Sequence, residues 1–75
     1  SMEGLSLAKR VEAAILKREL SLTHVSVEVP SAGLVLLTGL VYSDVGKDTL
    51  LKAVKSVPGV KEVRSEISVV PAQYY

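Results

Sequence analysis

Side chains that could act as acids, bases or nucleophiles are few in this chain. It has one histidine, His24, and no cysteine among 75 residues, so it offers no thiolate nucleophile and no pair of imidazoles for a metal. Glu28 and Glu66 are expected near each other across a sheet, where carboxylates beside lysine or arginine are typical of cross-strand charge pairs. The sequence therefore predicts a protein that is not an enzyme, with no cofactor and no metal.

Nucleic-acid binding would need other residues. The five glycines, at positions 4, 33, 39, 46 and 59, never form the Gly-x-x-Gly loop that clamps a phosphate backbone, and the expected strands carry no aromatic platform for bases. The formal net charge is only +1. The lysines that could reach phosphates are interleaved with aspartates 44 and 48: Lys47, Lys52, Lys55 and Lys61. We therefore expect no nucleic-acid partner.

Residues 33–41, GLVLLTGLV, give the strongest functional signal. In a half-buried strand apolar and polar residues alternate, but here both alternate sets are apolar. One set is expected to face the core: Val35, Leu37 and Val41. The other is expected on the outer face, with Val70 as an added member: Leu34, Leu36 and Leu40. Burying three leucines contributes about 5 to 9 kcal/mol against an association cost of at least about 4, so the outer set predicts a protein contact surface.

The alternative is that another part of the same chain covers this face. The segments that could do so are Leu16, Leu20 and the Tyr74–Tyr75 tail. The charged residues of the first predicted helix, by contrast, lie mostly off its apolar stripe and are interpreted as a solvated helix face: Lys9, Arg10, Glu12, Lys17, Arg18 and Glu19.

Two helices and three strands are predicted to position these residues. Apolar spacing indicates a helix over 6–20 with Ser6 as its N-cap, followed by a strand over 23–29 that Pro30 ends. A strand over 34–41 returns as a hairpin. A second helix follows an N-cap at Ser43 and runs to Val57, and a last strand covers 60–70.

The predicted fold class is α+β, a single small domain of order α-β-β-α-β. Seventy-five residues bury only roughly 60% of their unfolded surface, which suffices for one layer of helices over one sheet. We expect a three-stranded mixed sheet with both helices on one face and the 34–41 strand in the centre. The domain is expected to cover 5–70. Residues 1–4, where Ser1 before Met2 indicates an added N-terminus, and 71–75 are expected to be tails.

These residues resemble the BON domain, a small module of bacterial osmotic-shock and nodulation proteins. The signature Gly-x-Val-x-Leu-x-Gly-x-Val is read at Gly33, Val35, Leu37, Gly39 and Val41. The Val-x-Gly-Val turn and the following strand are read at Val57, Gly59, Val60, Val63, Ile67 and Val69, and the leading helix at Leu7, Val11, Ala14 and Ile15. All of these are expected core or turn positions, so the resemblance is specific for fold and carries over no catalytic residue.

The resemblance implies a non-catalytic binding module that attaches to membrane phospholipid or to envelope proteins, in the periplasm or cell envelope of a bacterium. In that setting Lys47, Lys52 and Lys55 would meet lipid head groups. If Met2 is the native start, the expected location is the cytoplasm instead. The alternative function is structural: a ring-forming or oligomerising module, hence a homo-oligomer, that uses the leucine-rich outer face of the sheet.

Overall fold

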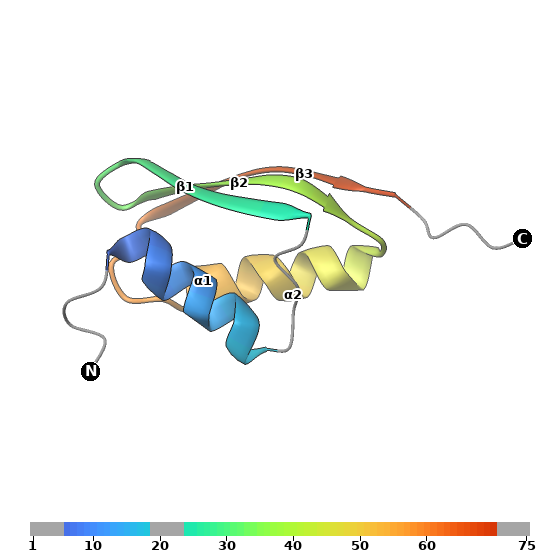
Figure 1. Cartoon of the computed structure of the whole chain (residues 1–75), viewed down its shortest axis with the longest axis horizontal. Helices are drawn as coiled ribbons and strands as arrows, with labels where there is room; N and C mark the ends of the chain where they lie inside the picture. The colour runs from blue at the N-terminus through green and yellow to red at the C-terminus, as the bar shows by residue number, and fades with distance from the viewer. Residues whose placement is uncertain (1–5, 19–23, 71–75) are drawn as a thin grey trace, which may run out of the picture.

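The computed structural model describes residues 6–18 and 24–70. Its elements are α1 (Leu7–Lys17), β1 (Val25–Ser31), β2 (Leu34–Val41), α2 (Asp44–Lys55) and β3 (Glu62–Val69). Figure 1 shows the three strands as one layer with both helices on the same side of it. The predicted α+β class, the order α-β-β-α-β and the placement of the helices are therefore confirmed.

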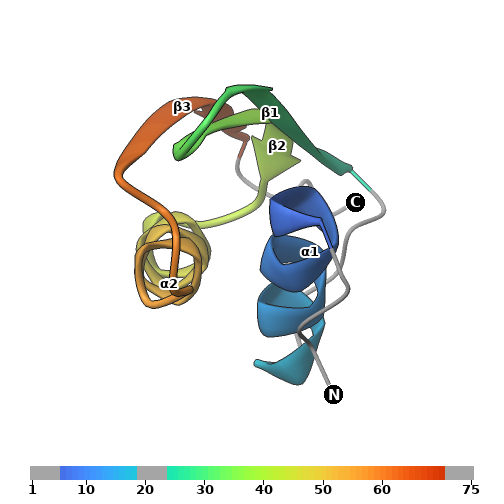
Figure 2. The ribbon, with the colours of Figure 1, turned by 90° about the vertical axis from the view of Figure 1, so that its left-hand side faces the viewer.

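The sheet has the order β1-β2-β3, so β2 is the central strand, as its two apolar faces predict. β1 pairs with β2 as an antiparallel hairpin, and β3 pairs with β2 in parallel after the α2 crossover. In Figure 2 α1 lies beneath β1 and α2 beneath β3. Each helix thus covers one side of the central strand, and the opposite face of the sheet has no helix in the described residues.

The core lies between the sheet and the two helices. Val35 and Leu37 of β2 have no exposed surface, and their register partners Val63 and Val27 point to the same side. The helices contribute Val11 and Ile15 from α1 and Leu50, Ala53 and Val54 from α2, which follow the i, i+4 spacing of an amphipathic helix. Neither helix in the described part of the chain combines the length and apolar character needed to cross a bilayer.

Local chemistry explains where the helices begin. The Oγ of Ser6 accepts a hydrogen bond from the backbone N–H of Lys9 at 3.3 Å, and the Oγ of Ser43 accepts one from Gly46 at 3.0 Å. Both serines are N-caps, as predicted, because their side chains satisfy backbone donors of the first turn. Helix α1 ends at Lys17, earlier than the predicted residue 20, although 19 and 20 lie outside the described residues.

The prediction that Pro30 ends the first strand is wrong. Strand β1 runs through Pro30 to Ser31, and its register with β2 shifts between Glu28 and Ser31. Proline lacks the N–H of a ladder donor, but β1 is an edge strand, where an irregular pairing tolerates the missing donor. Gly33, with φ 79, then completes the turn into β2.

Candidate functional site

Three leucines lie on the face of the sheet that the helices leave open. We call Leu34, Leu36 and Leu40 the leucine face. They alternate along β2 with the buried Val35 and Leu37, and each is half-buried. Their neighbours on β1 and β3 are polar: Leu36, for example, lies between Glu28 and Arg64. The leucine face is therefore an apolar stripe along the centre of the sheet with polar strands on both sides.

Charges on this polar border are arranged differently from the prediction. Glu28 and Glu66, expected to approach each other, lie on β1 and β3 with β2 between them: Glu28 is beside Leu36 and Glu66 beside Thr38. Neither forms an ion pair with any residue that the structure describes, whereas Glu62 accepts from the Nε of Arg64 at 2.9 Å. The two carboxylates thus flank the leucine face instead of converging on one reacting atom.

The chain segments predicted to cover the leucine face do not do so where the structure describes them. Leu16 lies on α1, in the helix layer, and is 54% exposed. Leu20, Tyr74 and Tyr75 lie outside the described residues. Val70, which follows β3 directly, is 42% exposed. Within residues 6–18 and 24–70, therefore, the outer face of the sheet remains accessible to a partner.

The three lysines expected to meet lipid head groups all lie on α2. Lys52 and Lys55 are exposed, and the Nζ of Lys52 lies 3.0 Å from the Oδ2 of Asp48, while Lys47 is half-buried. Because each residue turns a helix by about 100°, Lys52 and Lys55 lie about 60° apart and Lys47 lies about 80° beyond Lys55. The structure therefore brings Lys52 and Lys55 together on one side and places Lys47 away from them.

A groove between the two helices was not anticipated from the sequence. It has a volume of about 790 Å³ and lies between α1 and the end of α2. We call it the basic groove and define it by Arg10, Ala13, Ala14, Lys17, Arg18, Ser56, Val57 and Pro58. Three of these residues are cationic and none is acidic, so the groove combines a positive border with apolar walls.

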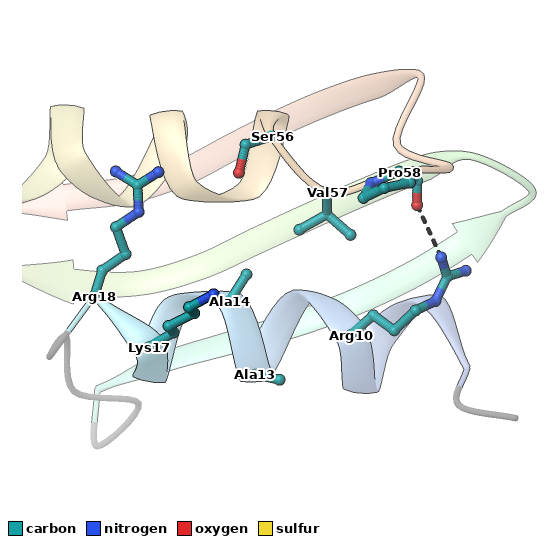
Figure 3. Close-up of a pocket in the computed structure, with 8 residues that line it drawn as sticks. All are labelled: Arg10, Ala13, Ala14, Lys17, Arg18, Ser56, Val57 and Pro58. Atoms are coloured by element: carbon teal, nitrogen blue, oxygen red, sulfur yellow. Dashed lines mark hydrogen bonds between the residues drawn. The ribbon is translucent and has the colours of Figure 1, made fainter. Parts of the chain in front are cut away.

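Figure 3 looks between the helices toward the sheet and shows how the cations lie along the basic groove. Arg10 is near Pro58, and its Nη1 donates to the Pro58 carbonyl oxygen at 2.9 Å. Its Nε is buried and has no partner among the described residues. Lys17 and Arg18 lie at the other end, with the Arg18 side chain extended toward α2. The sequence signal was the seven-residue spacing of Arg10 and Lys17, which places both on one side of α1.

A smaller hollow of about 270 Å³ contains the only histidine of the chain. His24 is exposed and packs edge-on against Tyr42, with ring centroids 6.2 Å apart. The other residues around it are apolar or small, apart from Ser43. Among residues 6–18 and 24–70, no three histidine or carboxylate side chains gather into a metal site. The Oγ of Ser43 in this hollow accepts a hydrogen bond from the backbone N–H of Gly46, as the N-cap of α2.

The fold has a clear relative among solved structures. The C-terminal domain of CdsD, described as the structural protein of the type III secretion system of Chlamydia trachomatis, superposes with a TM-score of 0.69 at 16% sequence identity. The match covers 87% of this chain but only 32% of that chain, so this chain corresponds to about a third of it. At this identity the likeness shows a shared fold.

Comparison at the level of sequence gives the family. No curated protein matches the chain. The model of the BON domain family matches residues 5–71, which include every described element from α1 to β3. The glycines of the signature and of the turn that were read in the sequence have structural roles here, since Gly33, Gly39 and Gly59 all have positive φ. The chain belongs to the BON domain family.

Proposed function

We propose that this domain is a non-catalytic binding module that attaches its protein to membrane phospholipid or to a protein of the cell envelope. Membership of the family supports a role in attachment. The observation that supports binding to phospholipid is the pair of exposed lysines, Lys52 and Lys55, on one side of α2. Lys47 lies on the same helix, about 80° beyond Lys55, and is half-buried. In this proposal the periplasm or the cell envelope is where the module works.

The strength of such attachment follows from the charges. Each basic residue near an anionic membrane surface contributes about 1 kcal/mol. Asp48 lies 3.0 Å from Lys52 and offsets part of that attraction. Three lysines on one domain therefore bind weakly, and firm attachment requires several copies that act together on the same membrane.

Vesicle flotation tests the lipid contact. The wild type is mixed with vesicles of phosphatidylcholine alone and with vesicles that also contain phosphatidylglycerol. We expect binding to the anionic vesicles only, its loss in K47E/K52E/K55E, and its weakening at high salt because the attraction is screened. A matched control, K9E/K61E/R64E, changes the net charge equally but leaves α2 intact.

The outcomes separate a local site from a general charge effect. If the control loses binding as completely as the α2 variant, the α2 lysines are not the contact. If the wild type floats with neither vesicle type, phospholipid attachment fails and only attachment to an envelope protein remains. Circular dichroism of each variant checks that the fold is unchanged.

A second candidate function is structural self-assembly, favoured by the accessible leucine face. An apolar centre inside a polar border is the general organisation of protein interfaces. Because the three leucines are already half-buried in the monomer, covering them contributes about half of the roughly 5 to 9 kcal/mol expected for full burial, which is close to the lower estimates of the association cost. We therefore expect weak self-association, strengthened where other parts of a larger protein hold several copies together.

Light scattering across a concentration series tests this candidate. The wild type is expected to increase in molar mass with concentration, whereas L36E stays a monomer because a carboxylate then lies within the leucine face. V45E is the matched control, since Val45 is 76% exposed but lies on α2. A wild type that remains a monomer throughout, with stability equal to L36E, would rule out self-assembly by this domain alone.

A further inference from the structure

The two edges of the sheet differ in regularity. The β1 edge contains Pro30, which cannot donate, and its pairing with β2 shifts between Glu28 and Ser31. Strand β3 contains no proline, and its eight residues pair with β2 without a shift. Proline and irregular pairing protect an edge against the addition of a further strand. Of the two edges, β3 is therefore the one suited to receive such a strand.

The backbone of β3 directs donors and acceptors to its outer edge. The N–H of Glu62 donates at 3.0 Å to Gly33, which directly precedes β2, so the even-numbered residues of β3 turn their backbone polar groups toward β2. Those of the alternate residues face the outer edge, where no described strand lies: Val63, Ser65 and Ile67. The described partner of the Ile67 N–H is the Oγ of Ser65 at 3.4 Å, a long distance for a hydrogen bond.

The side of α2 next to this edge carries two lysines with a leucine between them. We call Lys47, Leu51 and Lys55 the α2 stripe. Figure 2 shows α2 beneath β3, with α1 on its other side. Ser56 lines the basic groove toward α1, and Lys47 lies about 180° around α2 from Ser56. The α2 stripe therefore lies on the side away from α1, below the outer edge of β3.

We propose that the outer edge of β3 and the α2 stripe bind an extended acidic peptide segment of a partner protein, which adds to the sheet as a fourth, antiparallel strand. This deepens the proposed function, on which it rests, by naming the site and the chemistry of the protein partner. In such strand addition main-chain hydrogen bonds supply affinity, and alternate side chains of the added strand supply specificity. Here those side chains would meet the α2 stripe.

Charge and spacing specify which peptide fits. The members of the α2 stripe are four residues apart, which gives steps of about 6 Å along the helix. Residues on one face of an extended strand repeat about every 7 Å, and Figure 1 shows α2 along the length of β3. An acidic-x-apolar-x-acidic sequence therefore places its carboxylates near Lys47 and Lys55 and its apolar side chain near Leu51. Asp44, in the first turn, limits the acidic part of the peptide at that end.

The proposed site also gives Lys47 a role that fits its position. Lys47 is half-buried beside the core, as is Leu51, whereas Lys55 is exposed. Lys52 lies about 60° beyond Lys55 on the side away from the α2 stripe, and its Nζ is 3.0 Å from Asp48. The peptide site therefore uses Lys47 and Lys55 but not Lys52.

Fluorescence anisotropy with a labelled heptapeptide tests the site. The probe is Thr-Glu-Thr-Leu-Thr-Glu-Thr, which places both carboxylates and the leucine on one face of a strand. The control peptide, Thr-Thr-Glu-Leu-Glu-Thr-Thr, has the same composition but places its carboxylates on the face opposite to the leucine. We expect the wild type to bind the probe, less tightly at high salt, and to bind the control peptide at least about tenfold more weakly.

Charge reversal on the protein tests the α2 stripe. K47E/K55E should weaken binding of the probe at least about tenfold, because carboxylates then face its glutamates. K9E/K52E is the matched control, since it changes the net charge equally and leaves the α2 stripe intact. Because Lys47 is half-buried, K55E alone is a second variant at an exposed position and should also weaken binding. Circular dichroism checks the fold of each variant.

N-methylation of the probe tests strand addition without changing any charge. In an antiparallel pair the leucine of the probe lies opposite an odd-numbered residue of β3 and turns its N–H toward it. N-methylation of the leucine should therefore abolish binding, whereas N-methylation of the threonine next to it should be tolerated, because that N–H points away from β3. Tolerance of N-methyl-leucine would overturn strand addition.

The outcomes separate this site from the lipid contact. If the wild type floats with anionic vesicles but does not bind the probe, the peptide site is wrong and the lipid contact stands. If K9E/K52E loses the probe as completely as K47E/K55E, the attraction is a general charge effect and the peptide site is again wrong. Binding of the probe with the expected pattern, without flotation on either vesicle type, would support the peptide site and overturn the lipid contact.

Discussion

Gly39 shows how a single residue is determined by its surroundings. It sits in β2 with φ 125, a conformation that side-chain-bearing residues rarely adopt. A Cβ there would overlap the backbone carbonyl oxygen of His24. That oxygen accepts a hydrogen bond from the backbone N–H of Leu40 at 2.9 Å. A glycine inside a strand predicts a bulge or a close backbone approach, and the backbone that approaches belongs to the start of the neighbouring strand, not to a helix.

Gly39→Ala is therefore expected to lower the free energy of unfolding by about 2 to 4 kcal/mol, since it combines backbone strain with a steric overlap. Urea denaturation followed by circular dichroism measures the change. Gly46→Ala is the control, because Gly46 lies in α2 without positive φ and should change stability by less than about 1 kcal/mol. Equal effects of the two substitutions would contradict this account of Gly39.

At the scale of elements, β2 contributes one set of side chains to the core and another set to the outer face of the sheet. Val35 and Leu37 fill the space between the sheet and the helices. The leucine face, on the other side of the sheet, remains half-buried. Successive residues of a strand point to opposite faces, so one strand supplies both the core and a contact surface. The polar strands on either side then limit that surface to a narrow stripe.

This division predicts unequal costs for two adjacent leucines. Leu37→Ala should destabilise the domain by about 2 to 5 kcal/mol, because it removes a fully buried side chain and leaves a cavity. Leu36→Ala should cost about 1 kcal/mol or less in the monomer. Urea denaturation at low protein concentration compares them. The assignment of the two faces would be wrong if Leu36→Ala were the more harmful change.

Over the whole molecule, function is expected from surfaces rather than from a pocket with reacting groups. The helix layer presents the lysines of α2 and the basic groove, and the sheet layer presents the leucine face between Glu28 and Glu66. The net charge of +1 does not reveal these local differences, because the lining of the basic groove contains cations and no acidic residue, whereas Glu28 and Glu66 border the leucine face. Local surface chemistry therefore decides which partners bind.

If copies associate through these surfaces, thermal stability must depend on protein concentration. Association stabilises the folded state by mass action, so the Tm of the wild type should rise by a few degrees for each tenfold increase in concentration. L36E should show a constant Tm over the same range. Differential scanning fluorimetry with an external dye measures both. A wild-type Tm that does not change with concentration would argue against self-association.

Much of this protein follows from local sequence patterns. The limits of β2 agree residue for residue with the prediction, and both serine caps are confirmed, because alternation, i, i+4 spacing and capping depend on residues a few positions apart. The same patterns identified the BON family and assigned Leu34, Leu36 and Leu40 to the outer face of the sheet. Pro30 was misjudged because only the sheet order shows that β1 is an edge strand.

Only the tertiary structure shows which residues that are distant in the sequence lie close together in space. The basic groove joins Arg10 and Lys17 of α1 to Val57 and Pro58, which are 40 or more positions away in the sequence. The separation of Glu28 from Glu66 likewise depends on β2 lying between their strands. Such proximities arise when helices and strands pack to bury their apolar faces, and no short-range pattern records which polar residues that packing brings side by side.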